Sequence, residues 1–362
     1  MKRIIIIFAV VLLLGALAAI GAFFFSRQVL TEQEAQKIAL EQKAQAEQAK
    51  NPLRLVSPER ALFFWLYGDS ILSLSDAGNL SITLQGVATL VEGSPFFDAL
   101  RDVSVSQSGE RALVVSTNSR GSLETYLYNA SRNVWTRIAG AVFTASLSPD
   151  GKRIARIREA FGAPGGIDVI SLEGDEGAVV SQARLLDPRL SWITNTTLEL
   201  ASAPSGAVPG FAFIVDAELK KTSPIAFEKD GFMSLWSPSG EIAFAYWIED
   251  GQERSAFIDR EGVVLRSLDN PIIPKKCAFA SNTQLLCGAP KKSPASGGLL
   301  LPDEYLMGAA QSEDQIVSVD AQTGRTTTLL KPLEALDVFS PLVQDGLFYF
   351  INRYGGIYSF AL

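Results

Sequence analysis

The stretch SLSPDGKRIA, residues 146–155, decides the fold, and LWSPSGEIAF at 235–244 is its second clear copy. In each copy an apolar strand enters a Ser-Pro-x-Gly turn and a second strand leaves it, because proline presets φ for the turn and glycine accepts positive φ. Weaker copies begin near Val103, Leu190, Cys277 and Val338. A cassette that recurs about every 44 residues indicates that one supersecondary unit is repeated along the chain.

Each unit reads as four short antiparallel strands. Aromatic and β-branched residues fill segments such as 124–128, 211–215 and 347–351, and Gly, Asn or Asp bound them. Four strands in a unit of this length are typical of a propeller blade. The chain from residue 53 is therefore predicted to be all-β, a seven-bladed β-propeller, with six or eight blades as alternatives. The units span about 59–93, 98–139, 142–186, 187–226, 231–268, 275–331 and 335–362.

The last unit offers only three strands, and the chain ends within it. An orphan apolar strand, Leu53 to Val56, lies just before the first unit. We expect this strand to complete the seventh blade, because closing the ring with hydrogen bonds removes exposed sheet edges.

The cassette resembles the repeat of TolB-like, WD-type propellers of bacterial envelopes. Residues 148–155 and 237–243 carry the resemblance, whereas 106–112 departs from it at the proline and the aspartate. The resemblance covers most of 53–362 but is specific in only two or three blades. It implies a scaffold, a binding module or an accessory domain of a peptidase. The hydrolase domain of such a peptidase needs a nucleophilic serine with a histidine, and this chain contains no histidine.

Composition excludes several function classes. The net charge is −7, and no basic domain stands out, so nucleic-acid binding is not expected. Without histidine, Ser-His-Asp and Cys-His catalysis and His-ligated metal sites are impossible. Two cysteines cannot form a four-thiolate site. We therefore expect no enzyme activity, no metal and no cofactor.

The N-terminus predicts a membrane anchor. An unbroken apolar run from Ile4 to Phe25 follows Lys2 and Arg3, and as a helix it spans about 33 Å, enough for a bilayer core. The two basic residues place the N-terminus in the cytoplasm and the rest of the chain outside. The alternative is a secretory signal cleaved near Ala16 to Ala18.

These features divide the chain into three parts. Residues 1–26 are predicted to form a single-pass anchor in the cell membrane, which makes the membrane itself a partner through residues 4–25. Residues 27–52 are rich in helix-forming Gln, Ala, Glu and Lys and predict a helical stalk. Residues 53–362 form the extracytoplasmic propeller.

Cys277 and Cys287 are predicted to form a disulfide. They lie on consecutive strands of a hairpin that turns at Ser281 to Thr283. If Ala280 pairs with Gln284, the two cysteines are directly opposite each other, within disulfide range. An oxidising compartment permits the bond. The alternative is a pair of buried thiols.

The sixth unit contains an insertion, Ala289 to Ala310, that is more apolar than a free loop requires. Its apolar residues are Leu299, Leu300, Leu301, Tyr305, Leu306 and Met307. They either cap the end of the ring or form a surface on which a partner docks.

The sequence thus predicts a membrane-anchored, non-enzymatic propeller that binds a protein of the cell envelope or acts as a scaffold there. The alternative is a propeller that binds or cleaves a carbohydrate or small ligand with carboxylates and tyrosines in its central funnel. An exposed apolar loop near Leu299 to Met307 favours the first function, and charged groups around a deep funnel favour the second.

Overall fold

The computed structural model describes residues 52–362, except 141, 161–162, 175–176, 183–184, 186, 293–299, 333 and 354. The predicted anchor and nearly all of the predicted stalk lie outside these residues. Within the described part, no helix is long and apolar enough to cross a membrane. The contacts assign nearly all described residues to one unit, Leu55–Leu362.

Antiparallel strands make up almost all of this unit, in five four-stranded sheets and one seven-stranded sheet. The first sheet comprises β2 (Ala61–Tyr67), β3 (Ser70–Ser75), β4 (Leu80–Leu84) and β5 (Val87–Leu90). The second comprises β6 (Ala99–Val105), β7 (Arg111–Thr117), β8 (Leu123–Asn129) and β9 (Val134–Ile138). The third comprises β10 (Val142–Leu147), β11 (Arg153–Ala160), β12 (Ala163–Ser171) and β13 (Ala178–Ser181). The seven-stranded sheet comprises β14 (Pro188–Trp192), β15 (Thr197–Ser202), β16 (Pro209–Asp216), β17 (Lys221–Trp236), β18 (Ala243–Glu249), β19 (Gln252–Ile258) and β20 (Val264–Ser267).

The remaining sheets hold the C-terminal third of the unit. One comprises β21 (Cys277–Phe279), β22 (Gln284–Pro290), β23 (Asp314–Asp320) and β24 (Thr326–Leu330), and the other β1 (Leu53–Ser57), β27 (Ile357–Ala361), β26 (Leu347–Asn352) and β25 (Val338–Gln344). Two short helices accompany them, the 3-10 helix η1 (Pro274–Lys276) and α2 (Asp303–Leu306).

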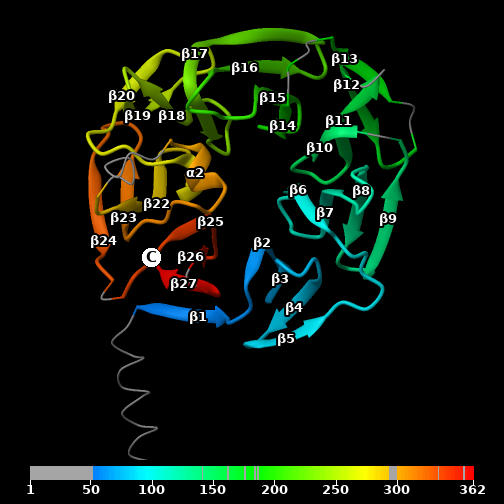
Figure 1. The fold of residues 1–362 in the computed structure, drawn as a ribbon, viewed down its shortest axis with the longest axis horizontal. Coiled ribbons are helices and arrows are strands. Elements are labelled where there is room, and N and C mark those ends of the chain that lie inside the picture. Colours follow the sequence, from blue (N-terminus) through cyan, green and yellow to red (C-terminus); the bar gives the residue numbers. More distant parts are fainter. Residues whose placement is uncertain are drawn as a thin grey trace, which may run out of the picture. The chain divides into compact units, whose positions relative to one another are not determined.

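The sheets follow one another around a ring in chain order (Figure 1). The strands β2, β6, β10 and β14, with which four of the sheets begin, lie nearest the centre, and β10 contacts both β6 and β14. In the seven-stranded sheet β17 has two roles, because its residues 221–225 and 229–230 pair with β16, while residues 230 and 233–236 pair with β18. The all-β, propeller-like fold predicted from the repeat is confirmed.

The ring closes through the start of the described chain. β1 is the outermost strand of the last sheet, beside β27, and β2 contacts β26 of the same sheet. The prediction that Leu53 to Val56 completes the last unit is therefore confirmed.

The Ser-Pro-x-Gly cassettes form the turns that their residues predict. Ser148 N–H donates to Arg153 O at 2.9 Å, Gly151 N–H donates to Ser148 O at 2.8 Å, and Gly151 has a φ of +70°. The turns also join neighbouring sheets, since Gln107 N–H donates to Pro149 O at 2.7 Å and Arg111 Nη1 donates to Gly151 O at 2.7 Å. The repeated motif thus builds each sheet and ties it to the next one.

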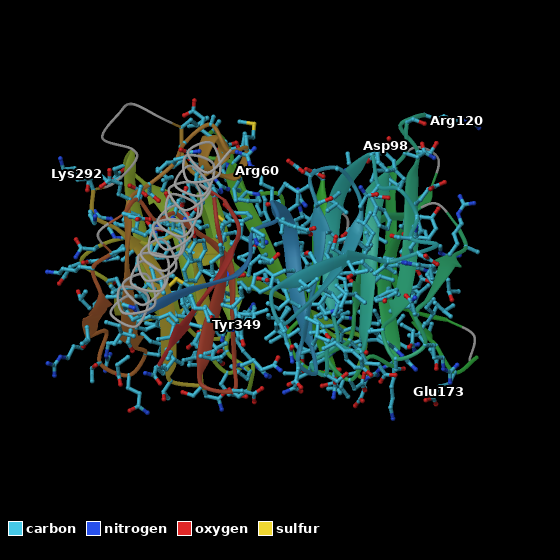
Figure 2. The ribbon with its side chains drawn as sticks, turned by 90° about the horizontal axis from the view of Figure 1, so that it is seen from below. Arg60, Asp98, Arg120, Glu173, Lys292 and Tyr349 are labelled. Carbon is cyan, nitrogen blue, oxygen red and sulfur yellow. A yellow bond between two sulfur atoms is a disulfide. The ribbon has the colours of Figure 1, made fainter. Side chains whose placement is uncertain are left out.

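Two opposite faces carry the loops. Arg60 and Asp98, which directly precede β2 and β6, lie on one face with Lys292, and Glu173 lies on the other (Figure 2). Lys292 belongs to the insertion and lies two residues after the end of β22. The insertion therefore leaves the sheets on the face where the inner strands begin.

Candidate functional site

The disulfide predicted from the hairpin is present. Cys277 of β21 lies opposite Cys287 of β22, with an S–S distance of 2.07 Å and a Cα–Cα distance of 4.1 Å. Ala280 N–H donates to Gln284 O at 2.8 Å, which is the turn register that the prediction assumed. Both cysteines are buried in the core of their sheet. The bond fixes β21 to β22 next to the point where η1 ends.

Residues 300–310, the part of the insertion that follows the undescribed residues 293–299, are called the insertion segment below. It buries Leu301 and Tyr305, which are 3% and 0% exposed, and it exposes Leu300 and Met307, at 46% and 74%. Leu306 is partly buried. Leu299, the sixth apolar residue of the prediction, lies outside the described residues. The segment therefore caps the fold with one set of apolar side chains and presents another set to solvent.

The buried side of the insertion segment packs against inner strands of neighbouring sheets. Leu301 and Tyr305 share a core cluster with Met233 of β17, Tyr246 of β18 and Ile273, and Phe339 of β25 packs against it. Because strands of two different sheets contribute to this cluster, the position of the segment depends on how these two sheets are arranged.

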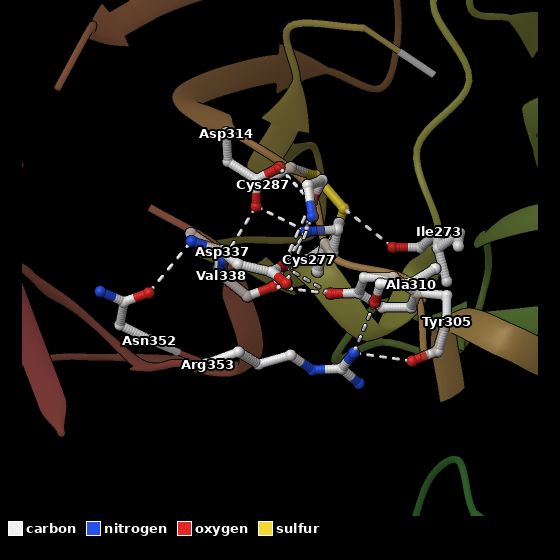
Figure 3. Close-up of polar contacts among 12 residues, drawn as sticks. Ile273, Cys277, Cys287, Tyr305, Ala310, Asp314, Asp337, Val338, Asn352 and Arg353 are labelled. Carbon is white, nitrogen blue, oxygen red and sulfur yellow. Dashed lines mark hydrogen bonds and ion pairs between the residues drawn. A yellow bond between two sulfur atoms is a disulfide. The ribbon is translucent and has the colours of Figure 1, made fainter. Parts of the chain in front are cut away.

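A buried ion cluster lies beneath the segment (Figure 3). The Lys276 ammonium lies 2.5 Å from Asp314 Oδ2 and 2.7 Å from Asp337 Oδ1, and all three side chains are at most 1% exposed. Lys276 Nζ also donates to Ser312 Oγ at 2.7 Å. Asp314 Oδ2 accepts from Val338 N–H at 2.8 Å, so the cluster joins the sheet of β21–β24 to that of β25.

Tyr305 connects the insertion segment to this cluster. Its hydroxyl donates to Asp337 Oδ1 at 3.0 Å. Arg353 covers its ring, with 4.2 Å between the guanidinium carbon and the ring centroid. Lys276 Nζ lies 4.7 Å from the same centroid.

Burial determines how these groups ionise. Desolvation raises the pKa of Asp314, and the nearby Lys276 ammonium opposes that rise. Burial, followed by the negative charge of Asp337, raises the pKa of Tyr305 well above its ordinary value. Tyr305 therefore stays protonated and remains a hydrogen-bond donor at any physiological pH. With its charges buried and mutually hydrogen-bonded, the cluster is suited to holding structure rather than to turning over a substrate.

The sequence did not reveal this cluster. Lys276, Asp314, Asp337 and Arg353 follow no common spacing, and charged residues are usually exposed. The only local signal is the position of Lys276 between the apolar run at 272–274 and Cys277. Neither repeat nor motif marks the two aspartates.

A second charged group lies on inner strands at the face where they begin. Arg101 of β6 forms an ion pair with Asp187, just before β14, and Arg189 Nη1 donates to Arg101 O at 3.4 Å. The ladder of β6 is irregular between residues 100 and 102, and irregularities of this kind re-aim side chains. Burial raises the pKa of Asp102, and the positive charge of Lys275, ahead of those of Arg189 and Arg101, opposes the rise. Positive and negative groups from the sheets of β6 and β14 and from η1 thus converge here.

Glu199 is a buried acid on β15. It is 6% exposed, and the Ser234 hydroxyl on β17 donates to its Oε1. Burial raises its pKa, and neutral donors including Ser234 and Ser191 oppose the rise. The folded protein therefore disfavours the charged form of this carboxyl group more than water does.

Replacing Glu199 with Gln should stabilise the protein at neutral pH. A folded-state pKa above the unfolded value of about 4.5 means that the acid does not oppose folding below that pH. Above that pH the free energy of unfolding decreases, because the folded protein still holds a proton that the unfolded chain releases. The decrease grows until the pH reaches the folded pKa. We expect E199Q to gain about 1 kcal/mol in the free energy of unfolding near pH 7, since a tenfold change in an ionisation equilibrium corresponds to about 1.4 kcal/mol.

Urea denaturation of wild type and E199Q between pH 4 and pH 8 measures this difference. The exposed Glu241, paired with Arg260, provides the control E241Q, which should follow wild type at every pH. A constant gap between E199Q and wild type across the range would contradict a raised pKa.

Comparison with known proteins supports the fold alone. No protein-family model matches the chain, and no curated protein matches it in sequence. The β-propeller domain of Cps50 (Swd1) from Myceliophteria thermophila has a TM-score of 0.55 at 12% identity, over 86% of this chain and 99% of that one. Oligogalacturonate lyase from Vibrio parahaemolyticus has a TM-score of 0.57 at 11% identity, over 85% and 91%.

TolB from Acinetobacter baumannii is also similar, at 14% identity and a TM-score of 0.47. The match covers 74% of this chain and spans 63% of the length of that one. The propeller fold that the cassettes imply is supported by the match to the Swd1 domain. The described chain is a β-propeller.

Proposed function

We propose that the chain is a non-enzymatic, protein-binding propeller of the cell envelope. In this proposal residues 4–25 anchor it in the membrane with the N-terminus in the cytoplasm, and the propeller lies outside. β17 ends one blade and begins the next, which gives a ring of seven blades. The disulfide between Cys277 and Cys287 supports an oxidising location.

One observation carries the proposal, namely the two-sided character of the insertion segment. Leu301 and Tyr305 fix the segment to the core, while Leu300 and Met307 remain exposed beside it. Leu300 lies against Gly206 of the loop between β15 and β16, and that loop exposes a further apolar side chain, Val208, at 55%. Exposed apolar side chains held on a rigid base are typical of a docking surface for protein.

The test is crosslinking in intact cells with L300S/M307S, followed by isolation from membranes and identification of the captured protein. We expect loss of the crosslinked partner, which should then bind the purified wild-type chain but not the variant. The control is L219S, which removes an exposed leucine, at 76%, from the turn between β16 and β17. Equal capture by wild type and L300S/M307S would overturn the docking surface.

A second candidate function rests on the charged group of the inner strands. Arg101, Arg189 and Lys275 suit an acidic ligand, and a solved structure of similar fold is an oligogalacturonate lyase. Titration calorimetry with an acidic oligosaccharide tests this candidate. Binding that R189E abolishes would favour a carbohydrate-binding or lyase-type propeller over a protein-binding one.

A further inference from the structure

The amino group of Lys276 meets two carboxyl groups in a site closed to bulk solvent (Figure 3). Its Nζ lies 2.5 Å from Asp314 Oδ2 and 2.7 Å from Asp337 Oδ1, and the three side chains are at most 1% exposed. Taking an ammonium and carboxylates out of water is costly, and their mutual attraction offsets that cost only in part. A reaction that removes one positive and one negative charge from this site therefore relieves the cost.

An amine and a carboxyl group can condense to an amide, and this site favours that reaction. The amine has to be unprotonated and the acid neutral, and desolvation favours both uncharged forms over the ions. Burial raises the pKa of Asp314, with the nearby Lys276 ammonium opposing the rise. Holding the two groups in contact also replaces a collision between molecules, and such pre-orientation corresponds to effective concentrations of about 10⁵–10⁸ M.

The surroundings of Asp314 suit attack at its carboxyl carbon. Its Oδ2, the oxygen beside Lys276, accepts from Val338 N–H at 2.8 Å. A fixed backbone donor at this oxygen stabilises the negative charge that develops there. Its Oδ1 accepts from Ser312 Oγ at 2.9 Å, and the same hydroxyl lies 3.2 Å from Asp337 Oδ1. Ser312 therefore connects Asp337 to the second oxygen of Asp314.

We propose that Lys276 and Asp314 join in an intramolecular isopeptide bond, with Asp337 as the acid–base group of the reaction. Asp337 Oδ1 takes a proton from the Lys276 ammonium and passes it through Ser312 Oγ. The proton reaches Asp314 Oδ1, which leaves a free amine beside a neutral acid.

The bond then forms without any other reactant. Nζ of Lys276 attacks Cγ of Asp314, and Oδ2 carries the developing charge against Val338 N–H. The Nζ–Cγ bond forms and the Cγ–Oδ1 bond breaks. A second proton follows the same route from Nζ to Oδ1, which departs as water. Nothing is oxidised or reduced, and Asp337 ends as the carboxylate with which it began.

The isopeptide bond stabilises the sheet that carries the insertion. It closes the chain between residues 276 and 314, which contains β21, β22 and the insertion. The next residue, Cys277, is bonded to Cys287 of β22. Consecutive residues thus fix the start of β21 covalently to β22 and to β23. Crosslinks that close long loops restrict the unfolded chain, so this sheet should resist unfolding whether or not a partner is bound.

Peptide mapping of the full chain tests the proposal. The folded protein is purified, denatured, reduced and digested with trypsin, and the peptides are sequenced by tandem mass spectrometry. A lysine whose Nζ is in an amide bond is not cleaved by trypsin. We therefore expect a branched peptide in which residues 276–291 are joined to residues 293–325. Its mass should be lower by one water molecule than the sum of its two parts.

Lys229 and Glu249 provide the matched control within the same digest. Their Nζ–Oε1 distance of 2.5 Å equals the distance between Lys276 Nζ and Asp314 Oδ2, but their side chains are 35% and 38% exposed. Contact in water leaves an ordinary ion pair, so both should be found in linear peptides. A branch at Lys229 would show that contact alone, without burial, produces the bond.

Three variants test the assigned roles. D314A removes the carboxyl carbon that is attacked and D337N removes the proton carrier, so both should lack the branched peptide. S312A interrupts the proton route at an uncharged side chain. It should form the branched peptide at least about tenfold more slowly after synthesis, as expected for the loss of a group that transfers protons.

The outcomes are distinct. A branch between Lys276 and Asp314 that is absent from D337N supports the proposal, and slower formation in S312A supports it where D337N does not fold. Linear peptides at Lys276 in the wild-type protein overturn it and leave an ion pair. A branch that joins residues 276–291 to 326–353 overturns the choice of Asp314, because that peptide carries Asp337. Formation at the wild-type rate in both D337N and S312A overturns the proton route.

Discussion

Replacing Lys276 with Met should cost about 3–5 kcal/mol in the free energy of unfolding, because removal of one partner leaves buried charge without compensation. Asp314 and Asp337 would both remain in a site that water does not reach. Methionine fills a similar volume, so the loss of packing is small. The midpoint of urea or guanidinium denaturation, with its slope, measures the effect.

The neighbouring Lys275 provides the control, because it is exposed and differs from Lys276 by one position on η1. K275M should change stability by less than about 1 kcal/mol. If K276M does not fold, the triple variant K276M/D314N/D337N decides the matter. Neutralising all three charges should restore a folded protein, since replacing a whole buried ion cluster is often tolerated. Equal stabilities of K276M and K275M would show that the cluster contributes nothing.

The predictable part of this fold is local in sequence. The Ser-Pro-Asp-Gly turn at 148–151 specifies its own geometry, since proline and glycine restrict the backbone whatever surrounds them. The hairpin at 281–283 fixes the register that brings Cys277 opposite Cys287 by simple counting. The completion of the last sheet by β1 followed from one missing strand and one orphan strand. Each inference needed only neighbouring residues and the repeat.

The parts that the sequence could not predict depend on contacts between distant segments. Lys276, Asp314, Asp337 and Arg353 meet only once the last two sheets are packed together. Hydropathy alone does not distinguish Leu300 from Leu301, although Leu300 is exposed and Leu301 is buried. It also groups Tyr305 with Met307, although Tyr305 is buried and Met307 is exposed. The contacts of the segment with Gly206 and Asp337 decide which apolar side chain faces the core. These contacts join distant parts of the chain, so no periodic pattern in the sequence predicts them.

The turn at Gly109 offers a test of how the repeated cassettes join neighbouring sheets. Gly109 has a φ of +72°, and a Cβ added there would lie 1.7 Å from Leu66 O in β2. Trp65 Nε1 donates to Gly109 O at 3.2 Å, so the same turn is hydrogen-bonded to that sheet. An alanine at 109 must push the two backbones apart and weaken this bond.

We expect G109A to lose roughly 1–3 kcal/mol from overpacking, in addition to about 1–2 kcal/mol for a side chain at positive φ. Gly121 separates the two effects, because its φ is +77° in the same sheet but nothing lies within 4 Å of an added Cβ. G121A should therefore show the conformational cost alone. Denaturation midpoints of wild type, G121A and G109A give the difference directly. If the two variants are equally stable, the close approach of the turn to Leu66 does not constrain the fold, and the cassettes join the sheets through their hydrogen bonds alone.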